Sequence, residues 1–323
     1  MRKRTDGDPA ASFLRSAALI CLIVCLALVT GCAASPSEPP SGGSVQTPEE
    51  TAAPPAEDAE PETLVELPYP EIRIYLDSLL WDRGFVRGET AYLPLSLFCR
   101  ELNMEPLCVM TDGVLTVQAH SLELSAGAGD EYMTVNGRYI FTPGGFVMVG
   151  DEPYIPAEAA EAIFNVKITA AEDMSRLDLD MDGAGVITGG ERYYTLNFDS
   201  ADVFWLSRII FAEATGQPLA GRIAVGNVVL NRVAHEEYPD SIHEVIFDTK
   251  GGVQFDTTLS NAVLNEADEL SVIAAYMALD GVNTAGNSLF FVNPAKGDDS
   301  WFRAALEHVA TIGDHDFYTI KGA

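Results

Sequence analysis

Two runs of sequence decide the fold of the C-terminal part of the chain, WLSRIIFAEATGQ at 205–217 and AVGNVVLNRV at 224–233. In both runs the apolar residues recur every three or four positions, which is typical of a helix with one buried face. Asp199 or Ser200 can cap the first helix with a side-chain oxygen, and a glycine shortly after Ala214 can end it. The two runs therefore predict a pair of packed helices.

The residues that follow extend this pattern to the end of the chain. A second helix is expected to begin near Pro218, and a third covers about 266–279. A short apolar strand at 289–292 and a pair of strands at 308–312 and 317–320 complete the pattern. We therefore expect a mainly α domain with a small amount of sheet.

The whole chain is acidic: its 323 residues include 19 Lys and Arg against 48 Asp and Glu, a formal net charge of −29. Nucleic-acid binding relies on basic surface that displaces counterions from phosphates, so we expect no nucleic-acid partner. The length allows about two domains at roughly 100 to 200 residues each, and an apolar fraction of 47% is ordinary for a globular protein. The sequence thus predicts a multidomain protein with at least one packed core.

The N-terminus has the parts of an export signal. A basic start precedes the thirteen apolar residues Ala17–Val29, a run shorter than the ~20 residues that cross a bilayer as a helix. The segment LVTGC at 28–32 resembles a bacterial lipobox, in which Cys32 is lipidated after removal of residues 1–31 as a lipoprotein signal peptide. We therefore expect an exported protein anchored to the outer face of the cytoplasmic membrane or to a spore membrane. A cleaved secretory signal and an uncleaved anchor with an incidental cysteine are the alternatives.

Residues 32–69 are expected to form a disordered, Pro- and Glu-rich tether. Between 33 and 61 the chain has seven prolines among Ser, Gly, Ala and Glu, and it has no aromatic residue and no Lys or Arg. Such a composition cannot bury a core, and polyproline-like chain extends by about 3.1 Å per residue. The tether can therefore hold a domain well away from the membrane.

The segment 70–183 alternates short apolar runs with turns and contains a repeat. Asn136-Gly137 between apolar residues is a strong signal for a hairpin, and helices that start at a proline are expected at 94–103 and 156–165. The residues around the second helix match those around the first at a constant offset of 62. A strand, a helix and a returning strand therefore occur twice, which predicts a small duplicated α+β module.

This module resembles the copper amine oxidase N-terminal-like domain over about 85–181. The resemblance lies in a Val-Asn-Gly strand at 135–137 that precedes a Tyr-Ile-Pro-Ala helix start at 154–157. It implies a non-catalytic spacer that can contact an envelope protein, and it implies no copper. Residues 184–197, which are rich in glycine, are interpreted as a linker.

Two features of the module raise the question of a disulfide and of a calcium site. Cys99 and Cys108 can form a disulfide in an exported protein, or they can stay buried and reduced. The run DLDMDG at 178–183 begins like a calcium loop, but its twelfth position is Gly189 rather than the bidentate Glu that such loops need. We therefore interpret that run as a last strand with acidic, solvent-facing side chains.

The C-terminal segment 198–323 resembles the cell wall hydrolase family of spore cortex-lytic enzymes, the SleB type. The motifs that carry the resemblance are the two opening runs, PDSI at 239–242, GVQF at 252–255, AAYMAL at 274–279, FFVNP at 290–294 and IGDHDFY at 312–318. The resemblance implies a lysozyme-like fold, similar to that of lytic transglycosylases. It also implies an enzyme that cleaves the glycan strands of peptidoglycan, in spore cortex or vegetative cell wall.

Glu213 is the residue that we expect to be catalytic. It lies at the end of the first predicted helix, where the macrodipole is negative, and beside apolar side chains, so its pKa should be raised. A general acid needs such a raised pKa near neutral pH. By the resemblance, this one carboxyl group acts as acid and then as base, because the C6 hydroxyl of the muramyl sugar attacks and a 1,6-anhydro end forms.

The same resemblance implies which other residues meet the substrate. The expected substrate-binding residues are Gln254, Phe255, Asn293, His315, Tyr276, Phe291 and Tyr318, and Asn231 is expected to support the site. Each has an ordinary structural alternative, such as a core aromatic or a turn residue. No cofactor and no metal is expected, because the segment after 199 has no Cys and no evident set of zinc ligands.

Two other functions fit parts of the sequence. One is a lipoprotein that binds peptidoglycan without cleaving it. The other is a cell wall amidase or endopeptidase, which would normally use zinc or a Cys nucleophile. The sequence does not separate a role in germination from one in sporulation or growth.

Overall fold

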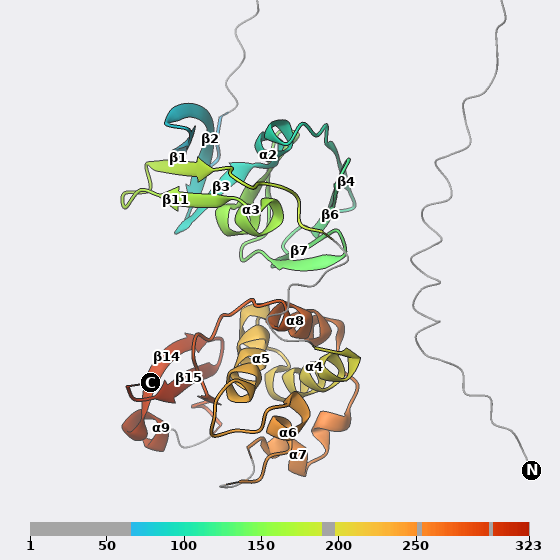
Figure 1. Ribbon diagram of the computed structural model, residues 1–323, viewed down its shortest axis with the longest axis vertical. Helices are drawn as coiled ribbons and strands as arrows, with labels where there is room; N and C mark the ends of the chain where they lie inside the picture. The colour runs from blue at the N-terminus through green and yellow to red at the C-terminus, as the bar shows by residue number, and fades with distance from the viewer. Residues whose placement is uncertain (1–65, 189–197, 251–253, 297–299, 323) are drawn as a thin grey trace, which may run out of the picture. The chain divides into compact units, whose positions relative to one another are not determined.

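The computed structural model describes residues 66–188, 198–250, 254–296 and 300–322 (Figure 1). The described residues all belong to one compact unit, the second of the two into which the chain divides, Thr63–Ala323. The predicted signal peptide, Cys32, most of the tether and most of the linker therefore lie outside the described residues. Within the described ranges, no helix has the length and apolar character needed to cross a bilayer.

The first part of the second unit contains two β-sheets and two short helices. A seven-stranded sheet has the order β11-β12-β1-β2-β3-β10-β9, and a five-stranded sheet has the order β4-β5-β6-β7-β8. The elements are β1 (Glu71–Leu76), β2 (Leu79–Arg87), β3 (Thr90–Pro94), α2 (Leu95–Glu101), β4 (Leu107–Thr111), β5 (Val114–Ala119), β6 (Leu122–Gly127), β7 (Tyr132–Val135), β8 (Arg138–Phe141), β9 (Val147–Val149), β10 (Glu152–Pro156), α3 (Ala157–Phe164), β11 (Lys167–Ala170) and β12 (Arg176–Asp180). Paired strands are antiparallel apart from β1 and β12, which are parallel.

The strand and the helix of the predicted repeat are present twice. β3 leads through Pro94 into α2, and β10 leads through Pro156 into α3, with each proline as the residue before its helix. The two strands pair with Leu93 opposite Ile155, residues that are 62 positions apart. The strands after the helices differ, because β4 joins the five-stranded sheet and β11 joins the seven-stranded one. The order strand, helix, strand therefore occurs twice, but the strands after the two helices join different sheets.

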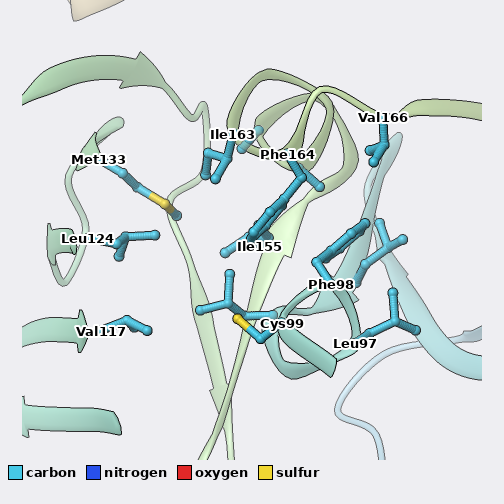
Figure 2. Close-up of a cluster of buried hydrophobic side chains, with 14 of the residues drawn as sticks. Leu97, Phe98, Cys99, Val117, Leu124, Met133, Ile155, Ile163, Phe164 and Val166 are labelled. Atoms are coloured by element: carbon cyan, nitrogen blue, oxygen red, sulfur yellow. The ribbon is translucent and has the colours of Figure 1, made fainter. Parts of the chain in front are cut away.

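The core of this module joins its two helices (Figure 2). Phe98 of α2 and Phe164 of α3 stack with their ring centroids 4.8 Å apart. Cys99 of α2 is fully buried, and burial raises the pKa of its thiol to about 12. Cys108 on β4 is also a free thiol. Of the two alternatives left open by the sequence, the structure has the reduced cysteines.

Two local predictions in the module agree with the structure. Asn136 and Gly137 form the turn between β7 and β8, with φ values of 49° and 78° that suit a two-residue hairpin. The acidic run at 178–183 begins in β12, where the Arg176 Nε–H donates a hydrogen bond to Asp178 over 2.7 Å. That run is the end of a strand. Among the described residues, no three His, Cys, Asp or Glu side chains are grouped so that they could hold a metal ion.

The described residues from 198 onward form a mixed α/β domain in which helices predominate. A three-stranded sheet has the order β13-β15-β14. The elements are α4 (Ser200–Ala214), α5 (Leu219–Val233), α6 (Ile242–Ile246), α7 (Asp256–Leu259), a 3-10 turn (Ala262–Leu264), α8 (Glu269–Leu279), β13 (Phe290–Val292), α9 (Ser300–Ala305), β14 (Leu306–Ile312) and β15 (His315–Ile320). Helices α4, α5 and α8 lie side by side around one apolar core (Figure 1).

Local caps set the ends of the long helices. The side chain of Asp199 accepts a hydrogen bond from the backbone N–H of Asp202 at 3.2 Å, and Asp202 accepts one from the backbone N–H of Asp199 at 2.9 Å. This reciprocal pair starts α4 where the sequence predicts. The third predicted helix, α8, begins at Glu269 rather than near 266. The reason is that Asp268 caps it, through a hydrogen bond from the backbone N–H of Ser271 at 2.9 Å.

Candidate active site

A cleft of about 570 Å³ opens in the C-terminal domain. It lies between the end of α4, the start of α7, strand β13 with the loop after it, and the start of β15. The side chains that line it are those of Ala212, Glu213, Arg232, Gln254, Phe255, Asp256, Thr257, Phe290, Phe291, Val292, Asn293, Lys296, Phe302 and His315. Aromatic rings and a few polar groups share this space, which is the usual make-up of a ligand site.

Glu213 is a half-buried carboxylic acid at the C-terminal end of α4. Burial raises the pKa of its side chain above the usual value, and the negative charge of Asp256 raises it further. Hydrogen bonds from Thr257 and the positive charge of Lys296 oppose this rise without cancelling it. The negative end of the helix macrodipole acts in the same direction as burial. Glu213 therefore keeps its proton to higher pH than an exposed glutamate does.

One oxygen of Glu213 is held by a neighbouring hydroxyl. The Thr257 Oγ1–H donates a hydrogen bond to Glu213 Oε1 over 2.6 Å. Thr257 belongs to the short helix α7, and Phe255, the residue before that helix, is 2% exposed. The buried ring thus anchors the segment that carries the hydroxyl. A carboxyl group held through one oxygen can present the other oxygen to a substrate.

Five of the residues expected to bind substrate line the cleft with Glu213, namely Gln254, Phe255, Phe291, Asn293 and His315. His315 is 5% exposed, and its Nδ1 has no hydrogen-bond partner among the described residues. Burial lowers the pKa of its imidazole, so the ring is neutral at neutral pH. The ring packs edge-on against Phe291, with centroids 5.4 Å apart.

Tyr276 and Tyr318, in contrast, do not line this cleft. Tyr318 follows His315 by three positions on β15, and residues an odd number of positions apart on a strand face opposite sides. Its ring is 2% exposed and packs against His308, with centroids 5.4 Å apart. Tyr276 lies on α8, a helix that contributes no residue to the cleft wall. The prediction that these two rings share the site with Glu213 is therefore corrected.

Asn231 does not line the cleft. Its side-chain amide donates hydrogen bonds to the backbone carbonyls of Gly286 and Ser288, both over 2.9 Å. These carbonyls belong to the loop that leads into β13, the strand that carries Phe291 to the cleft. Asn231 is thus placed where it can position this strand.

The cleft also contains four polar side chains that the sequence did not single out, Arg232, Asp256, Thr257 and Lys296. Asp256, Thr257 and Lys296 follow closely on residues of the GVQF and FFVNP motifs, so those motifs pointed to the correct loops. The sequence could also have indicated Arg232, because it is a charged residue inside the apolar run 224–233. The direction in which each side chain points could not be read from its position in a motif.

Comparisons with known proteins cover most of the domain that holds this cleft. Residues 216–318 match the family model described as Cell Wall Hydrolase, a match that begins just after Glu213. The chain is 26% identical over 136 residues to a spore cortex-lytic enzyme of Oceanobacillus iheyensis, covering 42% of this chain and 48% of that protein. It is 27% identical over 120 residues to a spore cortex-lytic enzyme of Halalkalibacterium halodurans, covering 37% of this chain and 35% of that protein. The chain thus spans half or less of the length of these relatives.

A solved structure, described as the catalytic domain of the germination-specific lytic transglycosylase SleB from Bacillus anthracis, aligns at 25% identity. The alignment covers 38% of this chain and 98% of that one, with a TM-score of 0.35. The resemblance of 85–181 to the copper amine oxidase N-terminal-like domain stays a prediction. By the family model and the curated relatives, the domain that holds the cleft is similar to the cell wall hydrolases.

Proposed function

We propose that the C-terminal domain cleaves the glycan strands of peptidoglycan, with Glu213 as the proton donor. The observation that carries the proposal is a half-buried carboxylic acid with a raised pKa on the wall of a cleft of about 570 Å³. Cleavage of a glycosidic bond needs a general acid that is still protonated near neutral pH. The similarity of this domain to cell wall hydrolases and spore cortex-lytic enzymes supports peptidoglycan as the substrate.

The reaction that we propose is that of a lytic transglycosylase. Glu213 gives its proton to the glycosidic oxygen while the bond from that oxygen to C1 of the muramyl sugar breaks, and C1 gains oxocarbenium character. The carboxylate then takes the proton of the C6 hydroxyl of the same sugar. The C6 oxygen bonds to C1 and closes a 1,6-anhydro ring. One carboxyl group serves both steps, and no water is consumed.

The neighbours of Glu213 suit these two steps. Burial favours the protonated acid that the first step needs, whereas the Thr257 hydroxyl and the positive charge of Lys296 favour the carboxylate that this step leaves. The rate should fall as pH rises through the raised pKa of Glu213, because only the protonated form can donate. Asp256 is an exposed carboxylic acid on the same cleft, so it is the candidate for a second carboxylate if the enzyme is a hydrolase.

We also propose that the chain is exported and held by a lipid on Cys32 at the outer face of the cytoplasmic membrane or at a spore membrane. The support is the order of apolar run, LVTGC segment and Pro-rich tether along the sequence. In this arrangement the module at 70–183 is a spacer that an envelope protein can contact. The tether gives the hydrolase-like domain the reach to act on nearby wall.

Replacement of Glu213 by Gln tests the proposed reaction. The full-length chain should release soluble fragments from purified peptidoglycan, and the Glu213→Gln variant should release them at least about 100-fold more slowly, because a general acid contributes roughly 10²- to 10⁴-fold. Glutamine keeps an oxygen that can accept the hydrogen bond from Thr257. A buried acid with a raised pKa loses stability when it ionises, so the variant should melt no lower than the parent at neutral pH.

The products separate the remaining possibilities. Mass spectrometry should find anhydromuramyl ends, whereas reducing ends would identify a hydrolase. Unchanged release by Glu213→Gln would refute the role of Glu213. Wall binding with no fragments from the unmodified chain would favour a non-catalytic lipoprotein, and cleaved stem peptides would favour an amidase. Parallel digestion of cortex and vegetative sacculi identifies the preferred wall.

A further inference from the structure

Arg232 is a buried cation on the wall of the cleft that neither gives nor takes a proton in the proposed reaction. It lies near the end of α5, lines the same cleft as Glu213, and is 4% exposed. Burial lowers the pKa of its guanidinium, while the negative charges of Asp248 and Glu213 oppose this change. Arginine keeps its charge at physiological pH. A buried charge is unfavourable unless its hydrogen-bonding groups have partners.

The chain supplies Arg232 with only some of the partners that it needs. Its Nε–H donates a hydrogen bond to the backbone carbonyl of Leu289 over 2.8 Å. Its guanidinium carbon lies 5.0 Å from the ring centroid of Phe255, 5.3 Å from that of Tyr238 and 5.7 Å from that of Phe290. Nη1 is buried and has no hydrogen-bond partner among the described residues. The rings and the carbonyl hold the guanidinium in place and leave that nitrogen unsatisfied.

A second arginine of α5 has the partners that Arg232 lacks. Arg222, ten positions earlier, is 5% exposed and does not line the cleft. Its Nη1 donates to the carboxylate of Asp268 and to the hydroxyl of Ser271, both over 2.6 Å. Its Nε donates to the backbone carbonyl of Gln217 over 3.3 Å. The two arginines are almost equally buried, but only the one away from the cleft is paired with a carboxylate of the described chain.

We propose that the incompletely paired guanidinium of Arg232 binds a carboxylate of the substrate at the cleft wall, which makes Arg232 a specificity-determining residue of the glycan-cleaving site. The inference rests on the proposed function. A carboxylate matches a desolvated guanidinium better than a neutral carbonyl does, because charge-assisted hydrogen bonds are the stronger ones. Lys296 brings a second positive charge to the same cleft.

Peptidoglycan carries such a carboxylate in two places close to the muramyl sugar. One is the lactyl group when the stem peptide is absent, and the other is the end of a stem peptide that has been cut short. A strand of N-acetylglucosamine alone carries neither. The net charge of −29 for the whole chain would repel an anionic group, so this preference requires a local cation such as Arg232 in the cleft.

Binding measured without cleavage tests the inference. The full-length chain with Glu213→Gln is titrated by calorimetry with tetrasaccharides of alternating N-acetylglucosamine and N-acetylmuramic acid. One probe has free lactyl carboxylates, the second has them converted to methylamides, and the third has them joined to alanine with its own free carboxylate. A carboxylate probe should bind about 10-fold more tightly than the methylamide, the effect of one charge-assisted hydrogen bond. The tighter of the two carboxylate probes identifies the source.

Variants of the two arginines assign this preference to a residue. Arg232→Met should weaken the binding of the carboxylate probe about 10-fold and that of the methylamide much less, whereas Arg232→Lys should keep part of the preference. Arg222→Met is the matched control, since it removes an equally buried arginine away from the cleft and should leave the preference unchanged. If circular dichroism shows that Arg232→Met does not fold, the comparison of probes on Arg232→Lys decides, because lysine keeps the charge but cannot reproduce the planar guanidinium and should keep only part of the preference.

Three results would overturn the inference: equal binding of all probes, no binding of any probe, or a carboxylate preference that survives Arg232→Met. These results are independent of cleavage. The proposed function itself fails if the unmodified chain releases no glycan fragments, which a separate assay with purified peptidoglycan measures.

Discussion

The hydrogen bond from Thr257 to Glu213 provides a direct test of how the acid is tuned. Thr257→Val removes the hydroxyl that donates to Glu213 Oε1 over 2.6 Å, and it keeps a side chain of nearly the same shape. The backbone N–H of Thr257, which also favours the ionised carboxylate, is retained. The substitution therefore removes one donor and leaves the remaining contacts of the acid in place.

The size of the effect follows from the charge on the acceptor. A hydrogen bond to a charged group contributes about 1.5–3 kcal/mol. Because this donor stabilises the carboxylate, its loss should raise the pKa of Glu213 further and move the alkaline limb of the pH–rate profile to higher pH. The maximal rate should fall about 10-fold or more, since the developing carboxylate loses at least ~1.4 kcal/mol of stabilisation in the transition state.

The assay is the initial rate of fragment release from purified peptidoglycan across about pH 4 to 9. Thr258→Val is the matched control, because the neighbouring hydroxyl donates to the backbone carbonyl of Phe255 over 2.7 Å and not to Glu213. Thr257→Ser keeps a hydroxyl and should restore the profile of the unmodified chain. Two results would refute the role of the Thr257 hydroxyl in stabilising the ionised Glu213. One is that the pH–rate profiles of Thr257→Val and Thr258→Val have the same alkaline limb, and the other is that this limb moves to lower pH in Thr257→Val.

Two further predictions concern charge and anchoring. Asp256→Asn should move the alkaline limb to lower pH, because the negative charge of Asp256 helps to raise the pKa of Glu213. The rate at the optimum should change by less than about 10-fold in a transglycosylase, whereas a hydrolase that depends on Asp256 would lose about 100-fold or more. Cys32→Ser should move the protein from the membrane fraction to the soluble fraction, since the lipid chains are its proposed anchor. Equal distribution of both proteins on immunoblots of the fractions would contradict lipidation.

The sequence predicts the parts of the fold that depend on residues close to one another along the chain. The cap at Asp199 and the Asn136-Gly137 turn each depend on residues within a few positions of one another. The strands that follow α2 and α3 differ, because the sheet that a strand joins depends on pairing with distant segments. The repeat in the sequence therefore predicted the order strand, helix, strand twice, but it could not show that β4 and β11 enter different sheets.

The sequence predicted most of the residues of the site, but not the directions in which their side chains point. His315 and Tyr318 belong to one motif and one strand, yet only His315 reaches the cleft, since their separation on β15 turns them to opposite sides. Gln254 and Phe255 reach the cleft because the segment before α7 borders it. A motif identifies the segment that forms a site, and the pleat or helical turn then selects the side chains that enter it.

The two buried arginines of α5 show that the partners of a buried charge cannot be read from the sequence either. In the sequence, Arg222 and Arg232 are alike, each a basic residue within a mostly apolar helix. The carboxylate that pairs with Arg222 comes from Asp268, which is 46 positions away and lies outside the helix. The incomplete set of partners at Arg232 is likewise visible only once the fold has brought Leu289 and three aromatic rings around it. Asp248 and Glu213 attract Arg232 electrostatically, but Nη1 has no hydrogen-bond partner among the described residues. A buried charge whose donors are not all paired destabilises the fold, so a partner from the substrate explains Arg232 better than packing alone does.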